Sequence, residues 1–287
     1  MPVVSEGSVV LSDGVAVWGQ IDGSGPPLVL CHGGPGLWDY LDSVAVVLRD
    51  EFTVHRWDQR GCGRSDVAPV YGLDVAVGDI QELKQAWSAN DPWAIVGHSW
   101  GAELALLSAV LHPESTSALV YVSGRGLQSW WHESGSARTR AEEGRRLAPA
   151  ALARREELAV IDRNDAEEAE FRRLSWAPDF AVQAPVPAAL EEMVNTPLRI
   201  NMAVNRALSR AQLFGEHELL AACERCRVPT LFIHGTLDPR PSDGARMMFE
   251  RFPIARFVEI DGAGHLPWVE RPVEFKSAVL GFLRSAI

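Results

Sequence analysis

The strongest chemical signal in the chain is a serine between two glycines, in the segment 96–101 with the sequence VGHSWG. The spacing Gly-x-Ser-x-Gly is that of a nucleophile elbow, a sharp turn from a strand into a helix that holds a serine hydroxyl clear of a sheet. Residues 93–96 are apolar, as in a buried strand, and residues 102–110 are rich in Ala and Leu, which favour a helix. We therefore expect Ser99 to be the nucleophile of an acyl-transfer reaction.

A serine nucleophile needs a histidine that takes its proton and an acid that orients the histidine. On sheets with this elbow the acid and then the histidine follow the serine in the chain. Asp238 follows the apolar run 230–234, and His265 follows the run 255–260 through a loop rich in glycine. We expect Ser99, Asp238 and His265 to form a catalytic triad. The alternatives fit the strand ends less well, and they are His234, His98, Asp243 and Asp261.

The negative charge of a tetrahedral intermediate needs backbone N–H donors. The Trp100 N–H lies at the start of the helix after the nucleophile, where the helix dipole favours negative charge. A second donor should come from the loop after the first parallel strand, and the segment 32–36, HGGPG, follows the apolar run 28–31. Glycines there let the backbone approach a substrate closely, so we expect the Gly34 N–H to be the second donor, with a simple turn as the alternative.

Length and charge limit the partners of this chain. Its 287 residues are 47% hydrophobic and 23% charged, which suits one large α/β domain or a core with an inserted unit. The formal net charge of −11 argues against nucleic acid and anionic membranes as partners, although it does not identify a substrate. Residues 1–6 lack the pattern of a signal peptide, and no apolar run is as long as a membrane span, so we expect a cytoplasmic protein.

The cysteines do not suggest a metal site. Cys223 and Cys226 have C-x-x-C spacing, but no second ligand pair lies nearby, and they close a predicted helix rather than open one. We expect plain thiols there, and we expect neither a metal ion nor a cofactor.

The elements that position these residues follow from the alternation of short apolar runs with helical ones. This alternation predicts an α/β fold, with a mostly parallel central sheet and helices on both faces. Asp13-Gly14 is typical of a hairpin turn between the first two long strands. The predicted strands are 3–4, 8–11, 15–21, 28–31, 52–57, 93–96, 118–122, 230–234 and 255–260, and the predicted helices are 38–48, 73–88, 102–110 and 273–283.

The alternation stops near residue 124. We expect a core of residues 1–124 and 228–287, with residues 125–227 inserted as a helical cap, or lid, that contains no strand. The helical segments expected there are 138–174, which is dense in mixed charge, 188–194 and 199–208, with a Pro-rich stretch at 177–187.

Three strings are specific in combination: HGGPG at 32–36, DQRGCGRS at 58–65 and GHSWG at 97–101. Together they resemble the proline iminopeptidase (prolyl aminopeptidase) branch of the α/β-hydrolase superfamily. The resemblance covers about residues 25–124 and 228–287, and it implies the α/β-hydrolase fold with a helical lid and a serine triad. From the residues themselves, we expect the string 58–65 to be a structural turn in which Arg and Asp tie loops together.

The chain departs from that branch in its cap. Peptidases of the branch hold the free amino group of the substrate with cap glutamates, one of them in a Trp-x-x-Trp-Glu-like stretch, which residues 174–180 lack. Asn201 stands where the second glutamate would be. Substitute acids are available, although a solvated helix face explains them as well, and they are Glu191, Glu192, Glu216 and Glu218. Three tryptophans could line an apolar pocket or simply pack in the core: Trp130, Trp131 and Trp176.

These observations predict a cofactor-free serine hydrolase that cleaves a small-molecule ester, lactone, thioester or amide, or a short peptide. Three alternatives stay open. One is a true proline iminopeptidase that releases an N-terminal residue, and another is a C–C bond hydrolase. The third is a binding protein that keeps the fold without turnover. The oligomeric state is open as well.

Overall fold

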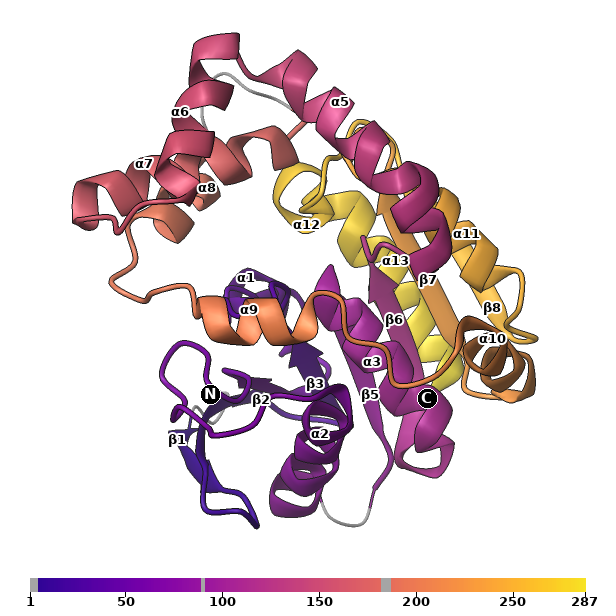
Figure 1. The fold of residues 1–287 in the computed structure, drawn as a ribbon. Helices are drawn as coiled ribbons and strands as arrows, with labels where there is room; N and C mark the ends of the chain where they lie inside the picture. Colours follow the sequence, from indigo (N-terminus) through magenta and orange to yellow (C-terminus); the bar gives the residue numbers. More distant parts are fainter. Residues whose placement is uncertain (1–4, 89–90, 182–186) are drawn as a thin grey trace.

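The computed structural model describes residues 5–88, 91–181 and 187–287. The strand expected at Val3-Val4 and part of the Pro-rich stretch, residues 182–186, lie outside the described residues. Figure 1 shows a sheet with helices against both of its faces and a group of helices standing over one end.

Eight strands form one mixed sheet in the order β1-β2-β4-β3-β5-β6-β7-β8. The strands are β1 (Ser5–Val10), β2 (Ala16–Gly23), β3 (Pro27–Cys31), β4 (Thr53–Trp57), β5 (Trp93–His98), β6 (Thr116–Val122), β7 (Thr230–Gly235) and β8 (Ala255–Ile260). β2 pairs antiparallel with β1, in the predicted hairpin, and with β4, and the other pairs are parallel. The predicted fold class is confirmed, and parallel strands bring their carboxyl ends to one edge.

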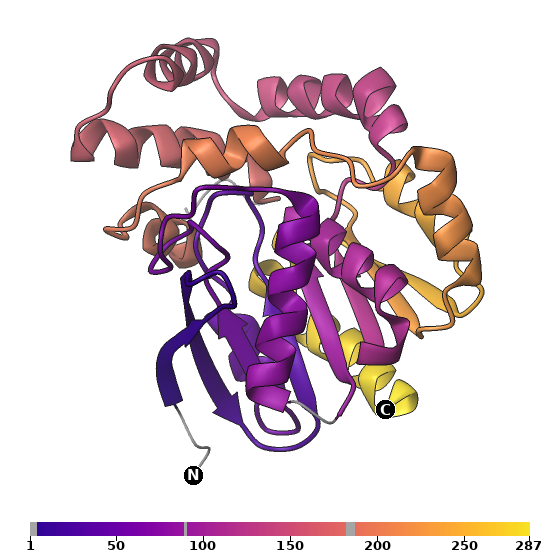
Figure 2. The same cartoon turned by 60° about the horizontal axis from the view of Figure 1, so that its bottom comes forward.

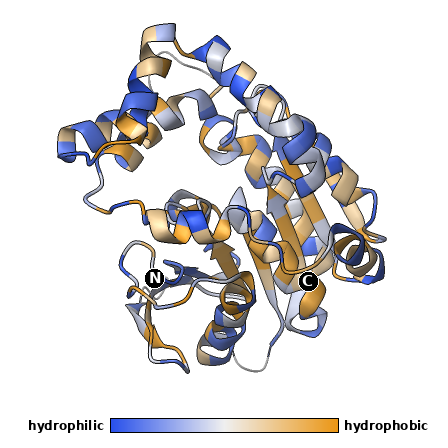
Figure 3. Cartoon of the chain, in the orientation of Figure 1, coloured by the Kyte–Doolittle hydropathy of each residue, from blue (hydrophilic) through white to orange (hydrophobic). Residues whose placement is uncertain are grey.

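Two apolar clusters cover the two faces of this sheet. Side chains alternate along a strand, so Ile95 of β5 belongs to one cluster and its neighbours Ala94 and Val96 belong to the other. The strands are coloured mainly as hydrophobic in Figure 3. The helices α2 (Leu73–Ser88), α3 (Trp100–Leu111) and α11 (Asp243–Phe249) pack on the first face, and α1 (Asp42–Leu48), α12 (Pro267–Glu270) and α13 (Pro272–Ala286) pack on the second.

The insertion between β6 and β7 is helical, as predicted, and contains no strand among its described residues. Figures 1 and 2 show helices α5 to α8 standing over the end of the sheet, with α9 passing between them and the core. The elements of the insertion are α4 (Gln128–Trp130), η2 (Trp131–Gly135), α5 (Ser136–Arg146), α6 (Pro149–Ala159), α7 (Asp165–Trp176), η3 (Ala177–Asp179), α8 (Ala188–Val194), α9 (Met202–Leu208) and α10 (Glu216–Arg225). The short η1 (Pro113–Ser115) precedes β6.

The helix predicted to begin at Trp38 begins instead at Asp42, as α1. Loop contacts hold the preceding residues out of the helix, because the Asp39 N–H donates to Asp58 Oδ1 at 2.6 Å. The Asp39 carboxylate also accepts from Arg56 at 2.6 Å. These partners are distant in sequence, so the helical spacing of the apolar residues could not reveal them.

Helix α10 belongs by its packing to the core, although it falls inside the expected cap of residues 125–227. Cys223 and Cys226 lie in the first apolar cluster, and Cys226 Sγ is 3.8 Å from the Ala109 carbonyl oxygen of α3. All four cysteines are free and buried, and burial raises the pKa of the Cys223 thiol to about 12. The prediction of plain thiols is confirmed. In the parts of the chain that the structure describes, no helix is both long and apolar enough to span a membrane.

Candidate active site

Ser99 occupies a strained backbone position between β5 and α3, with φ of 55° and ψ of −122°. Such outliers cost about 1–3 kcal/mol and cluster at functional sites. The flanking glycines permit the close approach of helix to strand, because a Cβ at Gly97 would lie 2.2 Å from the Gly101 carbonyl oxygen. Ser99 is half-buried while its neighbours His98 and Trp100 are buried. The elbow therefore presents this serine from an otherwise closed surface.

Asp238 and His265 lie together at the carboxyl ends of β7 and β8. His265 Nδ1 is 2.7 Å from Asp238 Oδ2, and the Asp238 side chain is completely buried. Because an ionised carboxylate only accepts hydrogen bonds, Nδ1 carries the proton and Nε2 keeps a lone pair that can accept another. The imidazole is thus oriented as a base.

The Asp238 carboxylate is ionised in spite of its burial. Burial alone would raise its pKa, but the neighbouring groups together outweigh burial, His265 foremost among them, and the pKa lies well below the ordinary value for aspartate. His234 and Arg240 lower the pKa further. Asp238 Oδ1 also accepts the Arg240 N–H at 2.8 Å. A fixed negative charge therefore faces the imidazole at every pH at which the protein is folded and working.

His98 joins the elbow to the loop of His265. His98 Nε2 donates to the His265 carbonyl oxygen at 2.9 Å, and Nδ1 lies 2.7 Å from the hydroxyl of Tyr40. That hydroxyl accepts the Gly33 N–H at 2.9 Å, so its own proton goes to His98. Burial and the nearby His265 hold the pKa of His98 well below its ordinary value, which keeps it neutral. This series of hydrogen bonds connects the glycine-rich loop, the elbow and the loop of His265.

The alternatives to the triad residues have other contacts. His98 makes the hydrogen bonds to Tyr40 and to the His265 carbonyl oxygen described above. His234 Nε2 donates to the Arg240 carbonyl oxygen at 2.7 Å. Asp243 pairs with Arg138 at 3.1 Å on the surface, and Asp261 is exposed. None of these four occupies the place that the Asp238–His265 pair has beside the elbow.

The glycine-rich loop lies against the nucleophile. A Cβ at Gly33 would be 3.0 Å from the Ser99 Cβ. The next residue, Gly34, has φ of 137°, a region that favours glycine. Trp100 is the first residue of α3, so its N–H is one of the donors that a helix leaves free at its start. Both expected oxyanion donors thus belong to segments that flank Ser99.

The string 58–65 is structural, as predicted. Asp58 Oδ2 accepts from Arg64 Nε at 2.6 Å and from the Arg64 N–H at 2.7 Å. The same carboxylate receives the Asp39 N–H described above. One buried aspartate therefore fastens two loops beneath the glycine-rich segment.

The cap tryptophans are packed rather than free. Trp130 is partly buried against the first core cluster, and the ring of Trp131 lies 5.5 Å from the Arg125 guanidinium. Trp176 meets the buried Trp38 edge-on, with ring centroids 6.0 Å apart. These contacts account for all three residues as packing, and their contact with a substrate stays a proposal.

Asn201 holds α9 in place. Its Oδ1 accepts the N–H groups of Ala203 and Val204 at 3.0 and 3.2 Å, which caps the helix at Met202 rather than at the predicted residue 199. Its Nδ2 donates to the Gly61 carbonyl oxygen at 2.8 Å. The amide is therefore committed to joining the cap to the core.

Tyr40, Asp179 and Arg240 contact the site and were not among the predicted site residues. Tyr40 fell inside a predicted helix, and Asp179 belongs to the cap, 86 positions before His265 in the printed sequence. No local spacing marks Tyr40 or Asp179, because their partners come from other parts of the chain. Arg240 follows Asp238 by two positions, but its ion pair with the distant Asp179 leaves no local signal. In residues 5–88, 91–181 and 187–287, no group of three His, Cys, Asp or Glu side chains is placed to hold a metal ion.

We expect Tyr40→Phe to lower the free energy of unfolding by about 1–3 kcal/mol, because it leaves the buried Gly33 N–H and His98 Nδ1 without their partner. Loosening the His265 loop should also lower kcat by roughly tenfold. Urea denaturation and steady-state kinetics measure the two effects. Tyr71→Phe is the control, since the Tyr71 hydroxyl also accepts a backbone N–H, from Ala68 at 3.2 Å. An equal fall of kcat in both variants would contradict the role of Tyr40.

Comparisons with known proteins place this geometry in context. A family model described as "alpha/beta hydrolase fold" matches residues 26–272. The proline iminopeptidase of Heyndrickxia coagulans is 22% identical, over 98% of this chain and 99% of that protein. The crystal structure of a Mycobacterium smegmatis proline iminopeptidase covers 98% of each chain with a TM-score of 0.74 at 21% identity. A 2-hydroxy-6-oxo-6-phenylhexa-2,4-dienoate hydrolase from Rhodococcus covers 99% of this chain and 100% of its own, with a TM-score of 0.71 at 19% identity.

Proposed function

This chain belongs to the α/β-hydrolase family and is a proline iminopeptidase-like hydrolase, and we propose that it works through a catalytic triad of Ser99, Asp238 and His265. The observation that carries the proposal is the 2.7 Å hydrogen bond from His265 Nδ1 to the buried Asp238 carboxylate, at the sheet edge that holds the strained Ser99. It leaves His265 Nε2 as the base that a serine hydroxyl requires.

The steps follow from these positions. Ser99 Oγ attacks the substrate carbonyl carbon and gives its proton to His265 Nε2, and the carbonyl oxygen becomes an oxyanion bound by the N–H groups of Trp100 and Gly34. The tetrahedral intermediate expels its leaving group, which takes the proton from His265. Water then attacks the carbonyl carbon of the acyl-enzyme and gives a proton to the same nitrogen. The second tetrahedral intermediate collapses to the free acid as Ser99 Oγ leaves and takes that proton back from His265 Nε2, which restores the enzyme. Each oxyanion donor is worth about 3 kcal/mol of barrier.

We propose that the substrate is a small ester, lactone, thioester or amide without a required amino group. A free amine is a cation, and binding it in a partly dry pocket needs a fixed anion. The cap acids that could supply one have other partners: Glu191 pairs with Arg173 at 2.8 Å, and Glu216 accepts from the Ser129 hydroxyl at 2.8 Å. Glu218 accepts the backbone N–H of Gly215, the residue immediately before its own helix, α10.

Two further carboxylates line cavities, one with Trp38 and Tyr40 and the other with Trp100. Glu192 is exposed on α8. Glu103 lines a largely apolar cavity of about 70 Å³ that reaches Trp100, but its oxygens are held by Arg125 at 2.8 and 2.9 Å. With Asn201 committed to α9 and the other acids engaged, the exposed Glu192 is the carboxylate of this set that the test must examine.

We expect weak discrimination between an amino-acid arylamide or ester with a free amino group and its N-acetyl analogue. The ratio of their kcat/KM values should stay below about tenfold, and ordinary p-nitrophenyl esters should be better substrates than proline arylamide. A preference for the free amine of about a hundredfold, roughly 2.7 kcal/mol, would restore the aminopeptidase assignment. Glu192→Gln and Glu216→Gln would then identify the acid responsible.

Two other functions are tested by adding a C–C bond substrate and a covalent serine label to these measurements. A C–C bond hydrolase would act on β-diketone-like substrates rather than on esters, and the likeness to the Rhodococcus hydrolase shows a shared fold alone. A binding protein without turnover would not react with a fluorophosphonate, whereas an activated Ser99 should be labelled.

A further inference from the structure

A short segment of the cap, residues 178–181, lies directly against both loops of the triad, and we call it the strap. The Asp179 carbonyl oxygen accepts the backbone N–H of His265 at 2.7 Å. Glu270 holds the neighbouring residues, since it accepts the N–H of Ala181 at 2.8 Å and that of Gly264 at 2.6 Å. The strap is therefore hydrogen-bonded to the loop of the base directly through the Asp179 carbonyl oxygen, and by way of the Glu270 side chain through the Ala181 N–H.

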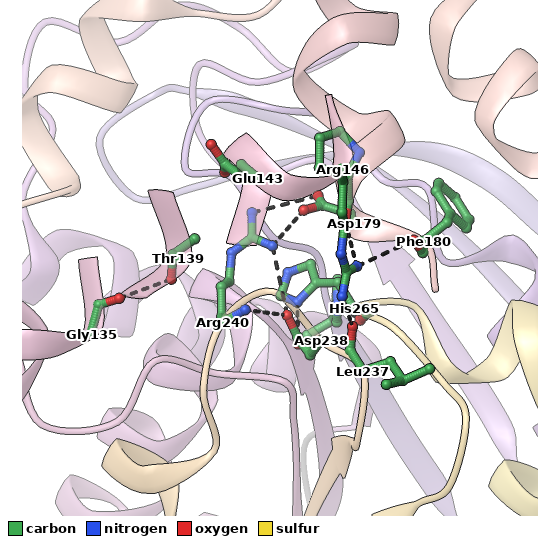
Figure 4. Close-up of polar contacts among 12 residues, drawn as sticks. Gly135, Thr139, Glu143, Arg146, Asp179, Phe180, Leu237, Asp238, Arg240 and His265 are labelled. Atoms are coloured by element: carbon green, nitrogen blue, oxygen red, sulfur yellow. Dashed lines mark hydrogen bonds and ion pairs between the residues drawn. The ribbon is translucent and has the colours of Figure 1, made fainter. Parts of the chain in front are cut away.

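An ion pair fastens the strap to the loop of the acid. Arg240 follows Asp238 by two positions, and its guanidinium donates to Asp179 Oδ1 at 2.5 Å. The same guanidinium lies 3.8 Å from Asp238 Oδ1, which also accepts the Arg240 N–H. Figure 4 shows Arg240 reaching from the loop of Asp238 to Asp179, beside the ring of His265.

Arg146 of α5 adds a second fastening. Its guanidinium donates to the carbonyl oxygens of Pro178 at 2.8 Å and Phe180 at 3.3 Å, and to that of Leu237 at 2.7 Å. Leu237 immediately precedes the acid, so a single side chain joins α5, the strap and the loop of Asp238 (Figure 4).

The strap also packs closely against the loop of His265. Phe180 is buried in the second apolar cluster with Leu266, the residue after His265. A Cβ at Gly264 would lie 2.3 Å from the Asp179 carbonyl oxygen, so only glycine permits this approach. Such contacts leave two discrete states, docked or undocked, rather than a gradual displacement.

We propose that the strap is a positioning element of the triad, in which Asp179 and Arg240 hold the loops of Asp238 and His265 in register with each other. This rests on the proposed function of the triad. The cap cannot lift at this point without freeing the His265 N–H and the guanidinium beside Asp238. Cap docking and triad assembly are then a single event.

The charges explain why both partners are needed. Asp179 neutralises the charge of Arg240. Without Asp179, the Arg240 guanidinium would interact more strongly with Asp238 and would compete with the imidazole for that carboxylate. Without Arg240, Asp179 would be a buried carboxylate facing no cation and would leave its place. Either loss misplaces the base by a fraction of an ångström, which lowers the rate of proton transfer more than it changes binding.

The test compares Asp179→Asn and Arg240→Gln with Arg240→Lys, which keeps the charge, and with Glu191→Gln, a control that breaks a cap ion pair away from the triad. With a p-nitrophenyl ester, we expect Asp179→Asn and Arg240→Gln to lower kcat by about ten- to a hundredfold with KM within about twofold of wild type. Arg240→Lys should recover part of the loss, and Glu191→Gln should behave as wild type. Fluorophosphonate titration counts active sites, so that kcat refers to folded enzyme alone.

A purely structural role would reduce the number of titrated sites and leave kcat per site unchanged, and this result would overturn the proposal. Hydrogen exchange of the peptide that carries His265 supplies a readout that does not depend on turnover. Its amides should exchange about tenfold faster or more in Asp179→Asn and Arg240→Gln, while those of Glu191→Gln should not change. Unchanged exchange refutes the strap, whereas a wild-type protein that neither hydrolyses esters nor takes the label refutes the proposed function instead.

Discussion

Replacing Ser99 with alanine is expected to lower kcat by at least about 10⁴-fold while the protein stays folded. In the proposed mechanism this hydroxyl forms the acyl-enzyme, and neither His265 nor the oxyanion donors can replace it. Stability should change little, because alanine meets the positive φ of 55° no better than serine does. Steady-state kinetics on any ester that the wild type cleaves, with thermal denaturation alongside, measures both effects.

Ser123→Ala is the matched control for this variant. Ser123 is the other serine in the described chain with positive φ, at 52°, and its buried hydroxyl has no hydrogen-bond partner among the described residues. The chemical change and the backbone conformation are therefore alike at both positions. Turnover by Ser99→Ala comparable to that of Ser123→Ala would show that the nucleophile is another group.

Replacing Asp238 with asparagine is expected to lower kcat by roughly 10⁴-fold. An amide that turns its NH₂ group toward the imidazole forces the other tautomer, in which Nε2 carries the proton and cannot accept one from Ser99. The negative charge that balances the imidazolium is lost as well, while Arg240 remains nearby. Kinetics on the same ester, with active-site titration, separates this effect from misfolding.

Asp261→Asn is the control for the acid. Asp261 is an exposed carboxylate in the loop that leads to His265, and its Oδ1 accepts from the Thr236 hydroxyl at 3.2 Å, a contact that asparagine keeps. We expect kcat within about twofold of wild type. A larger loss of kcat in Asp261→Asn than in Asp238→Asn would show that the acid of the triad is Asp261 and that its assignment to Asp238 is wrong.

The order and type of the core elements were predictable because their signals are local. Residues 73–88 have apolar side chains at helical spacing, and α2 has those bounds. The apolar run 230–234 became β7 with one added residue. Residues 255–260, which include the exposed Arg256 and Glu259, became the edge strand β8 with the predicted bounds. Burial between two helical layers requires apolar residues on both faces of a parallel strand, and such runs are visible in the sequence.

The short elements were less predictable. Helices α11 and α12 were not predicted, since seven and four residues carry little periodicity. The start of α1 and the place of α10 depend on partners far along the chain, namely Asp58 for the first and α3 for the second. A pattern of hydrophobicity records which side of a helix is buried, but not what buries it.

The sequence by itself determined the fold family, the elbow, and the order of serine, acid and histidine at the ends of strands. Those features depend on local turns and on the rule that parallel strands end at one edge. Only the tertiary structure decided what surrounds them: Tyr40 and His98 beside the glycine-rich loop, and Asp179 of the cap paired with Arg240 of the core. Their contacts join segments that are 58 and 61 positions apart. A hydrogen bond between such segments depends on how whole layers pack, and that arrangement leaves no periodic trace in the residues themselves.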